Sequence, residues 1–177
     1  MDKLQTYTLS VFTENRPGLL GRITIILTRR RLNIENINVS ESEVKGVHRY
    51  TLAICTTRER AEKATAQIGK LVDVLKAFVH SESEVICLEL ALYKLGVTPV
   101  NRPAVEQVIR QHRAHLLDVN PEFMVVEKTG QRSETEQLRL DLEKYGVLEF
   151  SRSGQVTVTR PMKALRSYLA EMEAATA

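Results

Sequence analysis

Apolar and polar residues alternate along some parts of the first half of the chain, and apolar residues recur at helical spacing along others. Alternation is the period of a half-buried strand, whereas apolar residues three and four positions apart indicate an amphipathic helix. The predicted strands cover residues 7–11, 34–39, 50–54 and 72–79, and the predicted helices cover residues 19–27 and 57–68. Gly46 marks a hairpin turn, Thr57 is placed to cap the second helix, and a triplet of arginines, Arg29 to Arg31, ends the first helix. The predicted order is therefore βαββαβ.

The same order of elements returns after the polar stretch of residues 80–84, which is the best candidate for a domain boundary. A turn at Asn120-Pro121 separates two strands, and Ser133 with Glu136 has the spacing of a capping box. The predicted strands are residues 85–92, 116–119, 123–126 and 147–150, and the predicted helices are residues 105–112, 133–145 and a terminal helix from about Met162. We therefore predict an α+β protein of two tandem ferredoxin-like βαββαβ domains, residues 1–80 and residues 81–177, the second including the terminal helix.

Composition narrows the class of protein. The 177 residues are 43% hydrophobic and 27% charged, which is typical of a globular protein. A formal charge of +3 falls short of the basic surface that binds a phosphate backbone, so nucleic acid is not an expected partner. We find no secretory signal and no apolar run of about 18 residues, so no membrane span is expected. Cys55 and Cys87 lie in alternating apolar runs and are expected to be buried thiols of a reducing, cytoplasmic protein.

The sequence carries none of the motifs that usually mark catalysis, such as a nucleophile elbow, a phosphate-binding glycine loop or a dinucleotide fingerprint. His112 and His115 could hold a metal between them, but no third ligand of suitable spacing lies nearby, so no metal site is expected. A pocket built around these histidines or Glu122 would make the chain a small enzyme, which we keep as an alternative. The leading class is a non-catalytic binding protein with no cofactor of its own.

One short motif occurs in both halves. Asn15-Arg16-Pro17-Gly18-Leu19 at the first strand-to-helix turn returns as Asn101-Arg102-Pro103-Ala104-Val105 at the corresponding turn of the second half. Gly18 has no Cβ and lets a ligand or another backbone approach the helix N-terminus, whereas Ala104 places a methyl group in the same position. We therefore predict one ligand site per chain, in the first half.

The first of these turns is suited to bind a carboxylate. A helix N-terminus offers unpaired N–H groups and a partial positive charge, and the Asn15 amide adds another donor, so the turn of residues 15–20 suits an amino acid. The alternative is purely structural: Asn15 caps the helix, Pro17 sets its first turn and Gly18 relieves crowding.

Topology suggests a second half of the site. In a split βαββαβ sheet the second strand lies at an edge, and a helix of about 14 residues separates its first residue, Asn33, from Gly18 by on the order of 20 Å. If two chains pair antiparallel through this edge, Asn33 of one chain meets the Gly18 turn of the other, and each dimer gains two pockets. The alternative is that Asn33 adopts a left-handed conformation after the helix.

Several stretches of the chain match a family that we know. The first half carries LSVFTENRPGLLGR at residues 9–22, LNIENI at 32–37 and KLVDVL at 70–75. The second carries ELALYK at 89–94, LDVNP at 117–121, EKTG at 127–130 and SRSG at 151–154. Together they resemble the small subunits of acetolactate synthase, and the first half resembles the ACT domain of that family.

The resemblance implies a regulatory subunit in branched-chain amino acid biosynthesis. Such a subunit dimerises through its ACT domains, activates a catalytic large subunit and makes it sensitive to feedback inhibition by valine. Thiamine diphosphate, magnesium and FAD are then expected only on the large subunit. The family's effector contacts correspond to Asn15, Gly18, Leu19 and Leu20 of one subunit with Asn33 and Ile34 of the other.

Two departures from the family pattern bear on the effector. Leu32 stands where many relatives have an aromatic residue, and the turn carries the bulky Arg16-Pro17 pair. Which branched-chain amino acid binds best is left open. The other reading of the resemblance is a stand-alone ACT protein that senses an amino acid and regulates transcription or another enzyme.

Overall fold

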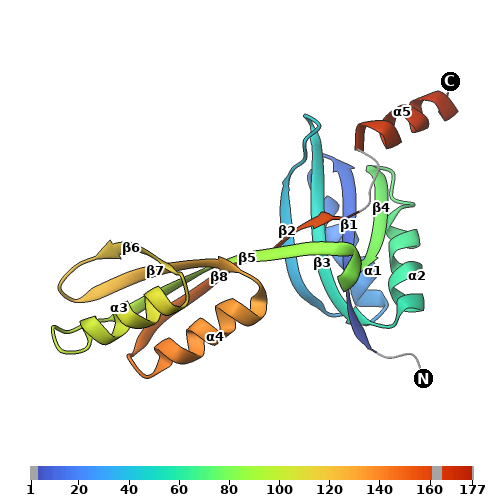
Figure 1. Ribbon diagram of the computed structural model, residues 1–177. Helices are drawn as coiled ribbons and strands as arrows, with labels where there is room; N and C mark the ends of the chain where they lie inside the picture. Colours follow the sequence, from blue (N-terminus) through green and yellow to red (C-terminus); the bar gives the residue numbers. More distant parts are fainter. Residues whose placement is uncertain (1–3, 161–164, 177) are drawn as a thin grey trace. The chain divides into compact units, whose positions relative to one another are not determined.

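The computed structural model describes residues 4–160 and 165–176. Two compact units divide the chain: residues 1–86 with 157–177, and residues 87–156. Each unit contains one four-stranded sheet, and two helices follow its strands in a βαββαβ-like order (Figure 1). The predicted fold class is thereby confirmed.

In the first unit the strands are β1 (Gln5–Glu14), β2 (Ile34–Glu41), β3 (Val47–Thr56) and β4 (Val74–Ser81). Their order in the sheet is β2-β3-β1-β4, and all neighbouring pairs are antiparallel. Because β1 and β2 both pair antiparallel with β3, they run parallel, and helix α1 connects them. The order therefore places β2 at one edge, as the sequence predicts, and β4 at the other.

Helices α1 (Leu19–Arg29) and α2 (Arg58–Ile68) cover one face of this sheet. The alternation of the strands decides which side chains meet them. Tyr7, Leu9 and Val11 of β1 point to the helices and form a core with Ile23 and Leu27 of α1. Burying such side chains contributes about 1.5–3 kcal/mol each, which is why the amphipathic pattern fixes the face that each element presents.

The terminal helix α5 (Leu165–Thr176) belongs to the first compact unit. Leu165 is fully buried against Phe12 and Val47, on the sheet face opposite α1 and α2. The expected division at residue 80, with this helix in the second domain, differs from the observed one. The hydrophobic period predicts the helix but not the distant strand that it covers. Met162, its expected start, lies outside the described residues.

The second unit repeats the topology with the strand order β6-β7-β5-β8. Its elements are β5 (Val85–Gly96), α3 (Arg102–Gln111), β6 (His115–Val119), β7 (Phe123–Gly130), α4 (Arg132–Glu143) and β8 (Val147–Thr159), with a short 3-10 helix (Glu82–Glu84) before β5. The capping box of α4 is formed by Gln131 and Glu134, so the predicted box of Ser133 and Glu136 is wrong. The helix begins two residues earlier, and Glu136 binds arginines instead.

The expectation of two buried thiols is also wrong for Cys55. Its side chain is exposed, whereas Cys87 is half-buried. Alternation explains the difference, because Leu52 and Ile54 take the positions of β3 that face the helices and Cys55 takes the opposite side, near the strand end.

Candidate functional site

In the turn between β1 and α1 the helix begins later than it would if Asn15 were its cap. Helix α1 starts at Leu19, and its N-cap is Gly18, with φ of 81° and no side-chain capping bond. Asn15 and Pro17 therefore precede the helix, and the interpretation of Asn15 as its cap is wrong. Among residues 4–160 and 165–176, no hydrogen-bond partner reaches the exposed Asn15 amide.

Gly18 is needed for its backbone angle rather than for space. Its φ of 81° lies in the left-handed region, where other residues are strained by about 1–2 kcal/mol. A Cβ built at this position meets no atom within 4 Å, so the residue relieves no crowding. The space beside Gly18 is open, and a ligand can approach the backbone there.

The first turn of α1 presents unpaired donors to this open space. The N–H of Arg22 bonds the carbonyl oxygen of Gly18 at 3.2 Å, so the N–H groups of Leu19, Leu20 and Gly21 have no acceptor within the helix. The first turn contains no acidic residue that would neutralise its partial positive charge. These groups together can hold a carboxylate.

An ion pair that the sequence reasoning missed holds the turn in place. The backbone carbonyl of Asp73 accepts the N–H of Glu14 at 3.0 Å, and the Asp73 carboxylate binds the guanidinium of Arg22. Asp73 thus fixes both sides of the turn. A cation in the first turn of a helix opposes the helix dipole, so Arg22 carried a signal that it needed an acidic partner.

The six predicted site residues do not all expose side chains. Leu19 is fully buried, so only its backbone groups are available, whereas Ile34 is partly buried against the core and 41% of Leu20 is exposed. Asn33 is exposed and its amide donates to Glu35 at 2.9 Å. The left-handed residue after α1 is Arg31, with φ of 53°, so the conformational interpretation of Asn33 is wrong.

Within one chain the two groups of site residues lie at opposite ends of α1. The helix has 11 residues and is about 16 Å long. Asn15 and Gly18 precede it, Leu20 lies in its first turn, and Asn33 and Ile34 follow it. One chain therefore does not bring the two groups together, and a site that uses both groups needs a second chain.

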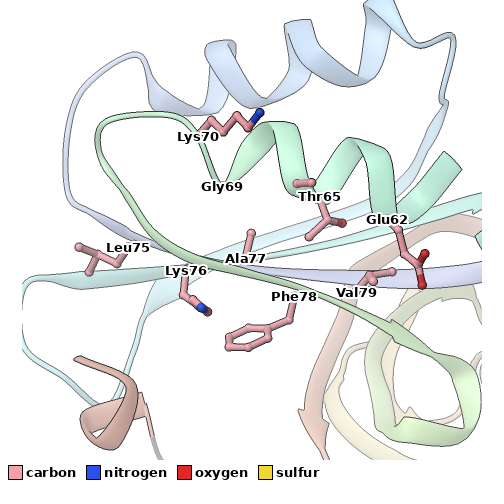
Figure 2. Close-up of a pocket in the computed structure, with 10 residues that line it drawn as sticks. Glu62, Thr65, Gly69, Lys70, Leu75, Lys76, Ala77, Phe78 and Val79 are labelled. Atoms are coloured by element: carbon pink, nitrogen blue, oxygen red, sulfur yellow. The ribbon is translucent and has the colours of Figure 1, made fainter. Parts of the chain in front are cut away.

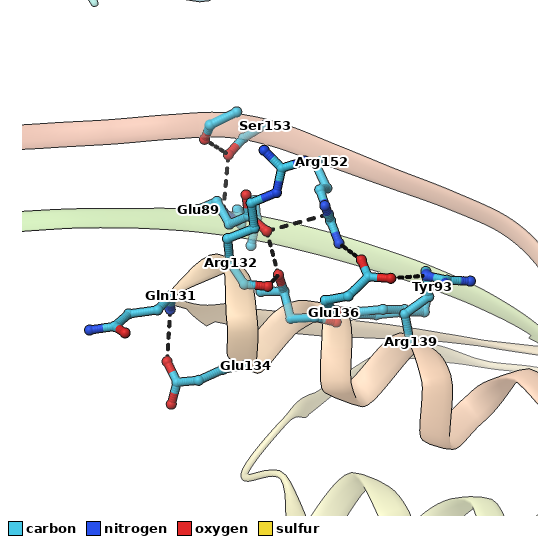
Figure 3. Close-up of polar contacts among 12 residues, drawn as sticks. Glu89, Tyr93, Gln131, Arg132, Glu134, Glu136, Arg139, Arg152 and Ser153 are labelled. Carbon is cyan, nitrogen blue, oxygen red and sulfur yellow. Dashed lines mark hydrogen bonds and ion pairs between the residues drawn. The ribbon is translucent and has the colours of Figure 1, made fainter. Parts of the chain in front are cut away.

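The second unit encloses its most conspicuous polar groups. Glu89 is only 3% exposed, receives a hydrogen bond from Thr135 and pairs with Arg152 at 3.3 Å. Arg152 also binds Glu136, which Arg139 contacts from the next turn of α4 (Figure 3). These hydrogen bonds from arginine lower the pKa of Glu136. Tyr93 donates to the carbonyl oxygen of Thr135 at 2.6 Å, and burial raises its pKa. Every charge in this cluster is neutralised internally.

The histidines of the second unit fit a structural role. His112 ends α3 and its Nε2 lies 2.7 Å from the carboxylate of Asp141 on α4, while His115 is exposed on β6. Within the described ranges, no three His, Cys, Asp or Glu side chains are grouped as metal ligands. In the same ranges, no helix is long and apolar enough to span a membrane.

The fold and the open turn define a class: a protein of two ferredoxin-like units, the first of them an ACT domain. Comparison with known proteins supports this assignment. The AHAS small subunit-like ACT domain matches residues 9–76, and the family described as the small subunit of acetolactate synthase matches residues 88–161.

Relatives extend the match along most of the chain. An acetolactate synthase small subunit of Mycobacterium bovis is 35% identical over 156 residues, which is 88% of this chain and 93% of that protein. One of Bacillus subtilis is 36% identical and covers 82% of this chain and 86% of that protein. The crystal structure of the Thermotoga maritima small subunit superposes with a TM-score of 0.82 at 27% identity, covering 90% of this chain and 99% of that one.

The chain belongs to the family of acetolactate synthase small subunits. Its relatives are named as the small subunit of that enzyme, which accords with a regulatory, non-catalytic chain.

Proposed function

We propose that this chain is the regulatory subunit of a cytoplasmic acetolactate synthase, which activates the catalytic large subunit and confers feedback inhibition by valine. The family membership carries the first part of the proposal. The open turn at Gly18 carries the second, because it presents unpaired N–H groups, and the Asn15 amide has no partner among the residues that the structure describes. Thiamine diphosphate, magnesium and FAD belong on the large subunit in this proposal.

The proposed homodimer pairs the β2 strands of two ACT domains. β2 is an edge strand, so its outward backbone groups are available to a second sheet. Ile37 and Val39 are opposite Leu52 and Tyr50 in the register, which places them on the helix side of β2, and they remain 37% and 41% exposed. Ile25 of α1 adds another exposed apolar side chain on this side of the unit. Association buries these side chains.

A two-fold axis between the β2 strands brings the Asn33 end of one chain to the Gly18 turn of its partner. The valine carboxylate then binds the first turn of α1, and Asn33 of the partner meets the other end of the amino acid. Valine stabilises the dimer arrangement in which these two groups are closest. A large subunit that discriminates between arrangements responds, and a coupling of about 1–3 kcal/mol suffices for up to a hundred-fold effect.

Reconstitution tests the proposal. Purified protein is mixed with the acetolactate synthase large subunit from the same source, and the rate of pyruvate condensation is measured with and without valine, leucine and isoleucine. We expect a higher rate on mixing and inhibition by at least one of the three amino acids. A large subunit whose rate is unchanged by this chain would overturn the proposal, and activity of the chain alone would support the small-enzyme alternative.

A further inference from the structure

A groove of about 610 Å³ lies between α2 and β4 in the first unit (Figure 2). Ala66 of α2 and Gly69, the residue after the helix, line one side, and residues 75–79 line it from the strand. None of the effector residues takes part in it. The groove is therefore a second feature of the ACT domain, separate from the turn at Gly18.

The groove runs along the free edge of β4. Ala77 and Val79 are opposite Val11 and Leu9 in the register and point to the helices, whereas Phe78 points to the other face. Side chains from both faces of a strand can line one groove only where the groove follows the strand edge. β4 pairs with β1 alone in its sheet, so its outward backbone N–H and C=O groups meet no second strand among the described residues.

Such a groove fits an extended segment rather than a compact ligand. A peptide that adds a strand to an open edge gains main-chain hydrogen bonds, and its alternate side chains enter the space on either side. Here Ala66 of α2 faces Ala77 and Val79 of β4 across the groove, and Phe78 lines it from the other face of β4, where its ring also packs against Tyr168 of α5. The small side chains of Ala66, Gly69 and Ala77 leave room for the side chains of the added strand.

The charge of the groove selects an acidic segment. Lys70 and Lys76 line it, both are exposed, and neither ammonium group has an ion-pair partner in the part of the chain that the structure describes. Glu62, which also lines it, already pairs with Arg58 at 2.8 Å. The uncompensated charge is therefore positive and complements carboxylates.

We infer that this groove is where a partner's extended, acidic segment adds a strand to β4, and that the partner is the catalytic large subunit. The inference rests on the proposed function. In that function the β2 edge is occupied by the second copy of this chain, and the sheet order leaves β4 as the opposite edge. A partner strand at β4 extends the same sheet whose β2 edge lies at the proposed valine site.

Hydrogen exchange on the complex tests the location. Amide exchange of the full chain is followed with and without the large subunit. We expect the N–H groups of Val74–Ser81 that do not face β1 to become protected at least about tenfold, because an added strand supplies their acceptors. Unchanged exchange along β4 in a complex that has formed would overturn the inference.

Substitutions test the charge and the space. Lys70→Glu with Lys76→Glu is expected to weaken binding of the large subunit by about tenfold or more at low salt. Lys45→Glu, at an exposed position in the turn between β2 and β3, is the matched control. Ala66→Trp fills the groove from an exposed helix position and is also expected to weaken binding, whereas Gln67→Trp on the neighbouring face of α2 is not.

Valine titration and sedimentation of each variant separate the two proposals. The groove variants are expected to keep the homodimer and valine affinity of the wild type. Full binding of the large subunit by both groove variants would overturn the inference while leaving the proposed function intact. Failure of the wild-type chain to bind the large subunit at all would overturn the proposed function itself. Self-association of Lys76→Glu without loss of binding would show that Lys76 only guards the edge against pairing.

Discussion

The two turns that share the letters Asn-Arg-Pro fold differently, and the difference separates a turn with unused hydrogen-bond donors from a turn closed by its own asparagine. In the first unit the helix begins after the motif, at Leu19, and Asn15 keeps its amide free of partners among the described residues. In the second unit the helix begins inside the motif, at Arg102. The Asn101 side chain accepts the N–H of Thr98 at 2.8 Å and donates to Gly96 at 3.4 Å.

A single residue accounts for this divergence. Gly18 takes a left-handed conformation that delays the helix, and the corresponding Ala104 lies inside the first turn of α3. The N–H groups of Arg102 and Val105 are bonded to Thr98 and Asn101, so fewer donors remain. The second unit also neutralises its buried charges internally. The comparison teaches that a repeated motif carries function only where its backbone leaves donors unused.

The largest effect is expected from a substitution that breaks the buried ion-pair cluster of the second unit. Arg152→Met leaves Glu89 buried without its counter-ion, so we expect the free energy of unfolding to fall by about 3–5 kcal/mol. Denaturant unfolding measures it. Adding Glu89→Gln should recover a large part of the loss, and valine affinity should stay unchanged. A loss of valine binding in the folded variant would contradict a site confined to the first unit.

Gly18→Asp is expected to abolish feedback inhibition while activation remains. The added carboxylate repels the effector's carboxylate, and we expect the half-inhibiting valine concentration to rise on the order of 100-fold. Gly18→Asn is the matched control, because it carries the same backbone strain without the charge. Inhibition assays of the reconstituted enzyme measure both. Equal effects of the two variants would assign the loss to strain rather than charge.

The two asparagines should show opposite responses. Asn15→Ala is expected to weaken valine binding by about tenfold with no change in stability, because its amide has no partner among the described residues and is free to bind the ligand. Asn101→Ala is expected to lower the unfolding free energy by about 1 kcal/mol with valine binding unchanged, because its amide closes the turn. Calorimetry and thermal unfolding of both variants check this. Parallel behaviour of the pair would remove the distinction between the turns.

The smallest effect comes from giving the second turn a glycine. Ala104→Gly is expected to cost about 0.5–1 kcal/mol of helix stability and to add no valine site, because Asn101 remains bonded and the N–H groups of Arg102 and Val105 remain paired. Titration calorimetry measures the number of sites per chain. A doubled stoichiometry would show that the glycine alone makes the site.

The hydrophobic period was enough to predict both βαββαβ units, the edge position of β2 and the end of α1 at the arginine triplet, because each depends on local pattern. The period did not predict at which residue of each turn the helix begins. Asn15 and Asn101 are both followed by Arg-Pro, and the backbone conformation of each turn separates their roles.

Contacts between residues far apart in the chain could not be predicted either, because the hydrophobic period describes only local structure. The pairing of Arg22 with Asp73 spans 51 positions, and Leu165 packs on Phe12 from the other end of the chain. Glu89 did give a signal, since it interrupts the inward-facing apolar positions of β5 and so requires a buried partner. The partner, Arg152, could be identified only from the order of strands in the sheet, which places β8 beside β5.

The central claim is that each valine site takes Gly18 from one chain and Asn33 from its partner, and mixed dimers test it most directly. Gly18→Asp and Asn33→Ala chains are each expected to bind no valine alone. When the two are refolded together, half of the dimers are mixed, and each mixed dimer has one site built from the intact Gly18 of one chain and the intact Asn33 of the other. Calorimetry should then recover about one quarter of the wild-type number of sites. No recovery, with mixed dimers shown to form, would contradict a site shared between chains.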